Sequence, residues 1–336
     1  MKNKMNSTFQ VARLNARTFP MSSEERHILS TIDAKVVEIE GDTDQEIVSA
    51  CKNTDAIMIV SAYLNGTVLK QLKNLKIISR LGTGVDKIDV EEATKQGVVV
   101  TNLPDFATDE VADHTMALLL SVARQLNYYE NVIRTGQRPQ LIKELHRLSV
   151  QNLGIIGFGR IGRAVAKRAK SFGMRVLVFD PMVTPEDAAK EGVEKVVLET
   201  ILQESDYLCL LCPLTPATRE MIQMKELKMM KQTSVLVNTG RGELINEKDL
   251  AEALKTRIIR YAAIDVFAGI NVFAENGYAV DHPFFSLENA LLTPHIAAGS
   301  MESLFNSRID GAMAVVDVLS GKSPIHCINP TVLKGA

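Results

Sequence analysis

Short apolar runs rich in β-branched residues alternate with helical patterns along nearly the whole chain, and this alternation restricts the fold most. The helical patterns include SEERHILSTI and NGTVLKQLKN. The apolar runs lie at 11–15, 35–40, 56–62, 76–82 and 98–102, and again at 150–159, 174–180, 206–212, 234–240, 261–267 and 289–295. Such alternation is typical of βαβ units, in which helices cover both faces of a parallel sheet. The two sets of runs predict an α/β fold with two doubly wound parallel-sheet domains.

The composition agrees with a large globular protein. The 336 residues are 46% hydrophobic and 23% charged, with a net charge of −2, which is enough for two domains. The near-neutral charge gives no indication of a nucleic-acid partner or of an anionic membrane. No apolar run reaches the ~18 residues of a membrane span. The first residues contain no apolar signal-peptide core, so we expect a cytoplasmic protein.

Two long helical patterns flank the second set of runs. The first, at 109–136, contains no proline, and Gly136 is a plausible stop. Its middle, VADHTMALLLSVA, is apolar nearly all round, which predicts a buried helix with His114 as a core or interface residue. The second pattern, at 301–322, closes the chain. We expect both helices to cross between the domains.

The motif CLLC, formed by Cys209 and Cys212, is compatible with a redox or zinc site. It lies inside the apolar run YLCLLCP, however, and residues three apart on a strand point to opposite faces. No second Cys or His pair follows at metal spacing. We therefore interpret both cysteines as buried structural residues and predict no metal site.

The segment GIIGFGRIGRAVAKRAKSFGMRVLVFD contains Gly157, Gly159 and Gly162 at the spacing of a dinucleotide-binding turn. In such a turn the first glycine permits a tight bend and the second lets a pyrophosphate approach the backbone. The third permits close packing of helix on strand. Asp180 ends the next predicted strand, where an acid can bind the ribose hydroxyls and repel a 2′-phosphate. The motif predicts NAD as the cofactor.

Two side chains are candidates for chemistry on a 2-keto acid. Arg241 follows the run SVLVNTG, and an arginine there can grip a carboxylate with two parallel hydrogen bonds. His295 follows NALLTP, and histidine is the usual general acid near neutral pH. Both residues come at the carboxyl ends of predicted strands, where open α/β sheets bind ligands.

The motifs GIIGFGRIG, CPLTPATRE, VLVNTGRGELI, AAIDVF and LLTPHIA occur in this order, together with GTGVDKID and DEVADHTMALLL. This set resembles the D-isomer-specific 2-hydroxyacid dehydrogenase family, with bacterial members near the C-terminal-binding-protein and phosphoglycerate dehydrogenase branch most similar. The resemblance implies a discontinuous flavodoxin-like substrate domain at 1–124 and 304–336. It also implies an NAD-binding Rossmann domain at 125–303 and a homodimer formed through the helix near 109–127.

The resemblance also assigns roles to residues. Arg241 is the implied substrate clamp and His295 the implied proton donor. Cofactor contacts are implied at Gly157, Gly159, Arg160, Ile161, Gly162, Asp180, Cys212, Pro213, Thr218, Thr239, Asp265, His295 and Ala297. Substrate contacts are implied at Ser61, Ala62, Tyr63, Leu81, Gly82, Thr83 and Arg241, with backbone N–H groups of Leu81, Gly82 and Thr83 holding the substrate carboxylate.

The sequence departs from the family pattern where a glutamate usually pairs with the catalytic histidine. Counting from Asp265, the matching position is Ile270, and counting back from His282 and Pro283 it is Asn276. The loop is longer than the family pattern, and Glu275 is the acid available inside it. We predict that Glu275 faces His295. His282 itself is expected to belong to the loop rather than to the catalytic group.

Two functions follow from these observations. The first is an NAD-dependent oxidoreductase that interconverts a small D-2-hydroxy acid and its 2-keto acid, with domain closure excluding water. The alternative is an NAD(H)-responsive, corepressor-like binding protein with weak or vestigial dehydrogenase activity. The altered glutamate loop supports the alternative, whereas Arg241 and His295 support the enzyme. The expected partner is the small acid itself, with no nucleic acid and no membrane.

Overall fold

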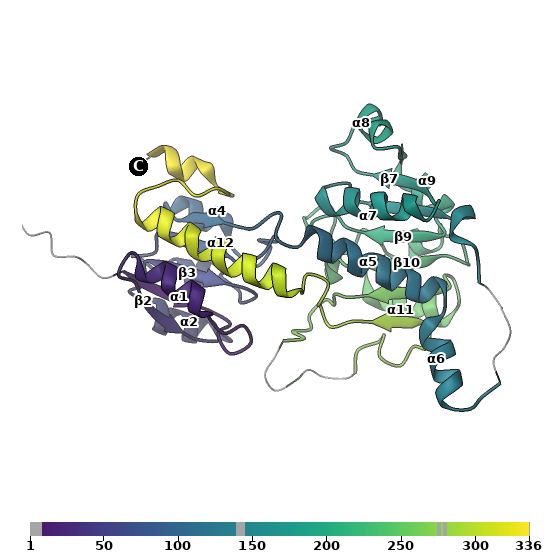
Figure 1. Ribbon diagram of the computed structural model, residues 1–336, viewed down its shortest axis with the longest axis horizontal. Helices are drawn as coiled ribbons and strands as arrows, with labels where there is room; N and C mark the ends of the chain where they lie inside the picture. Colours follow the sequence, from purple (N-terminus) through teal and green to yellow (C-terminus); the bar gives the residue numbers. More distant parts are fainter. Residues whose placement is uncertain (1–8, 139–144, 274–276, 278–280, 336) are drawn as a thin grey trace, which may run out of the picture. The chain divides into compact units, whose positions relative to one another are not determined.

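The computed structural model describes residues 9–138, 145–273, 277 and 281–335. Contacts divide the chain into two compact units (Figure 1). Unit 1 comprises Met1–Ala107 and Ser300–Ala336, and unit 2 comprises Thr108–Gly299. Unit 1 is therefore discontinuous in sequence. The predicted domain borders, 124/125 and 303/304, differ from these unit borders because they place the first long helix in the substrate domain. The borders of the functional domains stay a prediction.

Unit 1 contains a parallel sheet in the strand order β2-β1-β3-β4-β5. Its strands are β1 (Gln10–Arg13), β2 (Lys35–Glu38), β3 (Ala56–Ile59), β4 (Ile77–Arg80) and β5 (Val99–Thr101). Its helices are α1 (Ser23–Ser30), α2 (Asp44–Cys51), α3 (Gly66–Leu69), α4 (Val90–Lys95), α12 (Met301–Leu319) and the 3-10 helix η3 (Pro330–Gly335). This strand order is that of flavodoxin-like folds, as predicted.

Side chains of unit 1 alternate between two apolar cores because successive residues of a strand face opposite sides of the sheet. Ala12 and Ile57 pack with α2, α3 and α4 on one face. Val11 and Met58 pack with α1 and α12 on the other. The C-terminal helix thus completes the core of the N-terminal sheet, which makes unit 1 dependent on both ends of the chain.

Unit 2 contains a parallel sheet in the strand order β12-β11-β10-β9-β6-β7-β8. Its strands are β6 (Asn152–Ile156), β7 (Arg175–Phe179), β8 (Glu194–Lys195), β9 (Tyr207–Leu210), β10 (Val235–Asn238), β11 (Tyr261–Ile264) and β12 (Ala290–Leu292). The order extends the Rossmann arrangement by one strand, with its switch point between β6 and β9. Ligands of such sheets bind outside the carboxyl ends of the strands.

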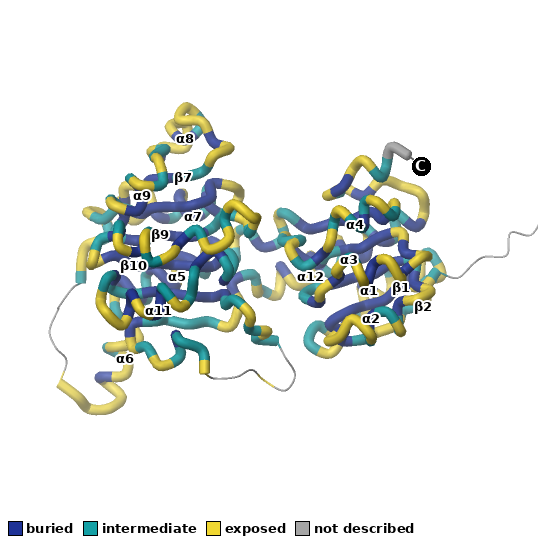
Figure 2. Tube along the Cα trace, turned by 180° about the vertical axis from the view of Figure 1, so that it is seen from behind, coloured by how far each residue is buried: buried dark blue, intermediate teal, exposed yellow. Residues whose placement is uncertain are grey.

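Helices cover both faces of this sheet. They are α5 (Thr108–Ala123), α6 (Leu126–Arg134), α7 (Arg160–Ser171), α8 (Pro185–Lys190), α9 (Leu198–Glu204), α10 (Met224–Leu227) and α11 (Glu247–Lys255), with the 3-10 helices η1 (Leu148–Val150) and η2 (Gly242–Leu244). α5 and α7 lie side by side on one face, whereas α9, α10 and α11 pack on the other. In both units the strands are largely buried and the exposed residues lie mainly on helices and loops (Figure 2).

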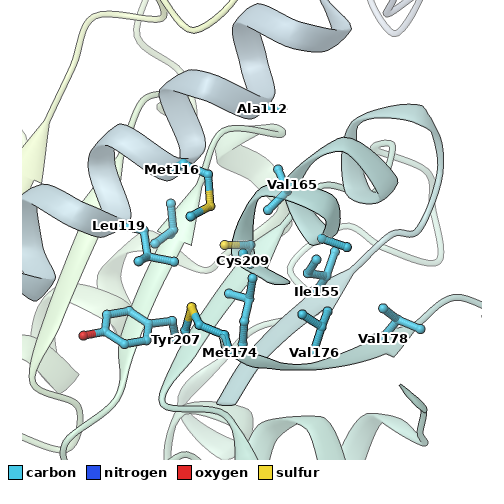
Figure 3. Packing of buried hydrophobic residues seen from close by; sticks show 14 of the residues in the cluster. Ala112, Met116, Leu119, Ile155, Val165, Met174, Val176, Val178, Tyr207 and Cys209 are labelled. Carbon is cyan, nitrogen blue, oxygen red and sulfur yellow. The ribbon is translucent and has the colours of Figure 1, made fainter. Parts of the chain in front are cut away.

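The two cysteines of CLLC lie on opposite faces of the unit 2 sheet, as predicted. Cys209 is fully buried among apolar side chains that include Met116 of α5 and Val165 of α7 (Figure 3). Cys212 is partly buried and packs against the core on the other face. Their positions fit structural cysteines at the centre of a sheet.

The prediction of one helix over 109–136 was wrong in its middle. α5 ends at Ala123, and α6 starts at Leu126 after Gln125, which has the left-handed φ of 50°. A left-handed residue cannot continue a right-handed helix. The break falls where the all-round apolar pattern changes to a polar one. Gly136 follows α6 with φ 66°, as expected of a helix stop.

Each predicted apolar run overlaps a strand, although the strands end earlier than the runs. One strand, β8, was not predicted. Glu194 and Lys195 offer no apolar run, and the strand exists because it pairs with β7 at the edge of the sheet. Edge strands are commonly short and charged, since this discourages pairing with other chains.

Candidate active site

The turn between β6 and α7 carries the glycine motif. Gly157 has φ 97°, and a Cβ there would lie 2.5 Å from the backbone nitrogen of Cys212. A Cβ on Gly162 would lie 2.2 Å from the carbonyl oxygen of Gly157. By contrast, a Cβ on Gly159, the N-cap of α7, would have no neighbour within 4 Å. Gly157 and Gly162 thus allow close packing, whereas Gly159 leaves space at a helix N-terminus for a pyrophosphate.

Asp180 lies one residue beyond β7, beside this turn. Its Oδ2 accepts the N–H of Phe158 at 2.8 Å, and its Oδ1 accepts the N–H of Met182 at 2.8 Å. A carboxylate offers about four acceptor sites, so each oxygen retains capacity for a ribose hydroxyl. Asp180 therefore both supports the glycine turn and fits the adenosine end of NAD.

The other residues predicted to contact the cofactor lie along the same edge of the sheet. Thr218 shapes the loop after β9, because its Oγ1 donates to the carbonyl of Pro213 at 2.7 Å and accepts the N–H of Thr215 at 2.8 Å. Thr239, after β10, is nearly buried and bonds Thr115 of α5 at 2.7 Å. Ile161 is partly buried, Arg160 is exposed, and both begin α7; Ala297 is buried after β12.

Arg241 follows β10 in a turn tied by the buried Asn238. The Nδ2 of Asn238 donates to the carbonyl of Arg241 at 2.8 Å, and its Oδ1 accepts the N–H of Gly240 at 3.0 Å. The Nη1 of Arg241 donates to the carbonyl of Gly240 at 2.8 Å. Gly242 packs closely, since a Cβ there would lie 2.2 Å from the nitrogen of Ala268. Arg241 is partly buried, and the hydrogen bonds of Asn238 hold its turn.

His295 follows β12 with an exposed side chain and a left-handed backbone, φ 55°. Its N–H donates to the carbonyl of Asp265 at 2.8 Å and to that of Thr293 at 3.1 Å. Left-handed geometry costs a non-glycine residue about 1–3 kcal/mol and persists only where neighbouring contacts enforce it. The turn at His295 is therefore held by its surroundings.

Asp265 is the centre of those surroundings. Its fully buried carboxylate accepts the hydroxyl of Thr293 at 2.6 Å and the N–H groups of Ile296 and Ala297 at 3.0 and 3.1 Å. His114 Nε2 lies 3.5 Å from the same carboxylate. Burial alone would raise the pKa of Asp265, but hydrogen bonds from His114, Thr293 and the two backbone groups hold that pKa below its usual range.

The loop after β11 passes beside His295. The ring centroid of Phe273 lies 5.8 Å from that of His295, at an interplanar angle of 38°. Glu275, the predicted partner of His295, lies outside the described residues, as does Asn276. Ile270 is described and partly buried. Phe273 was not predicted as a site residue, because only the folded loop brings it to the histidine.

Glu247, at the start of α11, contacts both ends of this loop. Its Oε1 accepts the N–H of Ala268 at 2.9 Å, and its Oε2 pairs with Nε2 of His282 at 2.9 Å. The His282 ring packs against Phe267 and Phe284. His282 thus belongs to the loop, as predicted. Glu247 was not predicted, because its partners are distant in sequence.

In unit 1, the loop after β3 contains the predicted substrate residues Ser61, Ala62 and Tyr63. The N–H groups of Ser61 and Ala62 donate to Oδ1 of Asn15 at 2.7 and 3.0 Å. Tyr63 is exposed, and Nζ of Lys87 lies 5.0 Å from its ring centroid. Asn15 therefore fixes the backbone of this loop and leaves the aromatic side chain outside.

The loop after β4 contains the other predicted substrate residues. The N–H of Leu81 donates to the carbonyl of Ile59 at 2.8 Å, and that of Gly82 to the carbonyl of Arg80 at 2.9 Å. Thr83 Oγ1 donates to the carbonyl of Leu103 at 3.0 Å. Two of the three backbone groups predicted to hold a carboxylate are thus engaged within unit 1.

Within the ranges that the structure describes, no group of three His, Cys, Asp or Glu side chains could hold a metal ion. Over the same ranges, no helix is both long and apolar enough to cross a membrane.

The part of the chain that contains most of unit 2 matches a family model. Residues 116–297 match the description "D-isomer specific 2-hydroxyacid dehydrogenase, NAD binding domain". The glyoxylate reductase of Korarchaeum cryptofilum is 37% identical over 294 residues, which cover 86% of each chain. The glyoxylate reductase of Thermococcus litoralis is 38% identical over 290 residues, covering 84% of this chain and 86% of that one.

A solved structure of a related enzyme superposes on nearly the full length of the chain. The D-lactate dehydrogenase of Aquifex aeolicus, complexed with NAD and lactic acid, superposes with a TM-score of 0.82 at 26% identity and covers 97% of this chain and 98% of that one. The predicted fold and cofactor are thereby confirmed. The chain belongs to the D-isomer specific 2-hydroxyacid dehydrogenase family of NAD-dependent oxidoreductases.

Proposed function

We propose that the hydride-transfer chemistry of this dehydrogenase takes place at the carboxyl ends of β10, β11 and β12. These three strands are neighbours in the sheet and lead to Arg241, Asp265 and His295. Adjacent strands lie about 4.8 Å apart, so a cation, a carboxylate and an imidazole gather at one edge. This juxtaposition is the observation that carries the proposal.

Each side chain has a distinct task. Arg241 binds the carboxylate of a small 2-keto or D-2-hydroxy acid through paired hydrogen bonds. His295 gives a proton to the keto oxygen during reduction and takes it back during oxidation. Asp265 holds the turn that presents His295. The nicotinamide of NAD, when bound, accepts or supplies the hydride.

The residues of the β6–α7 turn fit that cofactor. Gly159 leaves open space at the N-terminus of α7 for the pyrophosphate, and Asp180 has acceptor capacity for the ribose hydroxyls. An acid at this position disfavours the 2′-phosphate of NADP. Thr239 and Ala297 lie along the same sheet edge and complete the proposed contacts.

Glyoxylate is the substrate to test first, because relatives from K. cryptofilum and T. litoralis are named glyoxylate reductase. A panel of small 2-keto acids with NADH, followed at the nicotinamide absorbance, ranks candidates by kcat/KM. The corepressor-like alternative finds no support among these relatives. Turnover of no acid in the panel would contradict the proposal.

Variants separate the two catalytic roles. Arg241→Ala should cost about 2–5 kcal/mol in transition-state binding, as for truncating one partner of a buried charge pair. His295→Ala should lower kcat by roughly 10²–10⁴ with NADH binding retained. NADH affinity, measured by fluorescence, controls for misfolding. An unchanged kcat/KM in either variant would refute the role assigned to that residue.

The proposal retains further expectations from the sequence and from the family resemblance. Glu275 is proposed as the carboxylate partner of His295, and Glu275→Gln should then lower kcat while NADH affinity stays unchanged. Of the three backbone N–H groups expected to hold the substrate carboxylate, the proposal retains that of Thr83, because those of Leu81 and Gly82 already donate to the carbonyls of Ile59 and Arg80. The protein is a cytoplasmic homodimer, and light scattering after size exclusion measures its mass.

A further inference from the structure

His114 and Thr115 are neighbouring polar residues on the otherwise apolar inner face of α5, and both reach the carboxyl edge of the sheet. Thr115 is fully buried and donates to the carbonyl of Val111, so at 2.7 Å it accepts the hydroxyl of Thr239. His114 Nε2 lies 3.1 Å from Oγ1 of Thr293. One turn of α5 is therefore bonded to the ends of both β10 and β12.

The direction of the hydrogen bonds fixes the protonation of His114 at Nε2. The single proton of the Thr293 hydroxyl goes to Oδ1 of Asp265 at 2.6 Å. Thr293 Oγ1 can therefore only accept from His114. His114 Nε2 lies 3.1 Å from Thr293 Oγ1 and 3.5 Å from Oδ1 of Asp265, so its N–H faces both oxygens.

This arrangement bears on His295 through the backbone. The Asp265 carboxylate accepts the N–H groups of Ile296 and Ala297, the two residues after His295. Thr293, two residues before His295, is bonded to the same carboxylate. His114 and Thr293 are the side chains that bond Asp265 within the described part of the chain. The left-handed turn at His295 thus depends on a carboxylate that His114 helps to hold.

We propose that His114 is a positioning residue: by donating Nε2–H to Thr293 and Asp265, it fixes the turn that presents His295 to the substrate. This inference rests on the proposed role of His295 as the proton donor. His114 makes no contact with the reacting atoms in this scheme. Its effect is expected on kcat rather than on cofactor affinity.

Substitutions at residue 114 test the donor itself. His114→Leu removes the donor, and we expect kcat to fall roughly 10–100-fold, the range found for orienting partners of histidine ligands at metal sites. His114→Gln supplies an amide N–H at a similar reach and should restore most of that loss. Asp113→Asn, the adjacent exposed residue paired with Arg168, is the matched control and should leave kcat unchanged.

Hydrogen exchange provides a readout without turnover. In His114→Leu, amide exchange should accelerate in the peptide spanning 293–299, whereas peptides from the rest of α5 and from β6 should keep wild-type rates. Acceleration throughout unit 2 would mean a general loss of stability and would overturn the proposal, as would wild-type kcat in His114→Leu. If His295→Ala also kept full turnover, the proposed function itself would have failed; if only His114→Leu did, the positioning role alone is wrong.

Discussion

A buried carboxylate stays ionised only where hydrogen-bond donors compensate for the water it has lost. Asp265 meets this condition with two backbone N–H groups and the side chains of Thr293 and His114. These contacts keep its pKa low although the side chain is fully buried. At the residue scale, this carboxylate links stability to the geometry of the turn at His295, the proposed proton donor.

Asp265→Asn should therefore change how stability depends on pH. Because the folded-state pKa is depressed, the ionised group stabilises the fold above the unfolded-state pKa of about 3.9, and this contribution is lost as the pH falls through the folded pKa. We expect the variant to lose about 1.5–3 kcal/mol at neutral pH, as for hydrogen bonds to charged groups. Urea unfolding at a series of pH values, from neutral to below 4, measures the free energy of unfolding of both proteins.

The difference between wild type and Asp265→Asn should shrink in acid, because both side chains are then neutral. A difference that stays constant across the pH range would show that Asp265 contributes packing rather than charge. The residue was predicted only as a cofactor contact. Its bonds to Thr293, Ile296 and Ala297 join β11 to the turn after β12 and have no local sequence signal.

At the scale of single elements, the loop after β11 is defined by where its ends are held. Glu247 bonds Ala268 at one end and His282 at the other, and Phe273 lies beside His295 between them. Glu247→Ala should release both ends and speed cleavage by chymotrypsin within 268–281. Glu252→Ala, an exposed acid on the same helix, is the matched control. Equal cleavage rates in both variants would contradict an anchoring role.

Strand β9 and the residues just after it give a second prediction at this scale. Burial raises the pKa of the Cys209 thiol to about 12 and that of Cys212 to about 11, compared with about 8.5 for a free cysteine. Alkylation by iodoacetamide near pH 8 should therefore be slow at both in the native protein and fast after unfolding in guanidinium. Peptide mass spectrometry measures the two rates. Rapid native labelling of Cys209 would be incompatible with its buried position.

Sequence patterns predicted elements well where the signal was local. The glycine turn, Asp180 and the strand ends at Arg241 and His295 follow from periodicity and short motifs. The break at Gln125 was missed because nothing in the local composition forbids a continuous helix there. His114, Glu247 and Asn15 were missed as site-shaping residues because their partners lie far away in the sequence.

At the scale of the whole molecule, both sheets follow known strand orders, and unit 1 needs both chain ends for its core. Unit 2 contains the complete glycine turn, Asp180 and the ends of β10 to β12. We therefore expect cofactor binding to be a property of unit 2.

NADH at 100 times its Kd should stabilise the protein by about 2.7 kcal/mol through mass action. NADPH at the same concentration should stabilise it much less, because Asp180 disfavours a 2′-phosphate. Differential scanning calorimetry measures the shift in Tm. Asp180→Ala should reduce the difference between the Tm shifts that NADH and NADPH produce. Equal stabilisation of the wild-type protein by both would rule out the assigned preference.

The contacts of Glu247 also bear on how such a protein can diverge. Because one side chain receives both ends of the loop, the distance that the loop spans is set by α11 and not by the length of the loop. The entropic cost of closing a loop grows only with the logarithm of its length, about 0.6 kcal/mol per doubling. Insertions between Ala268 and His282 should therefore cost little free energy. The loop can thus change in length while the sheet, the glycine turn and the turn at His295 keep their contacts.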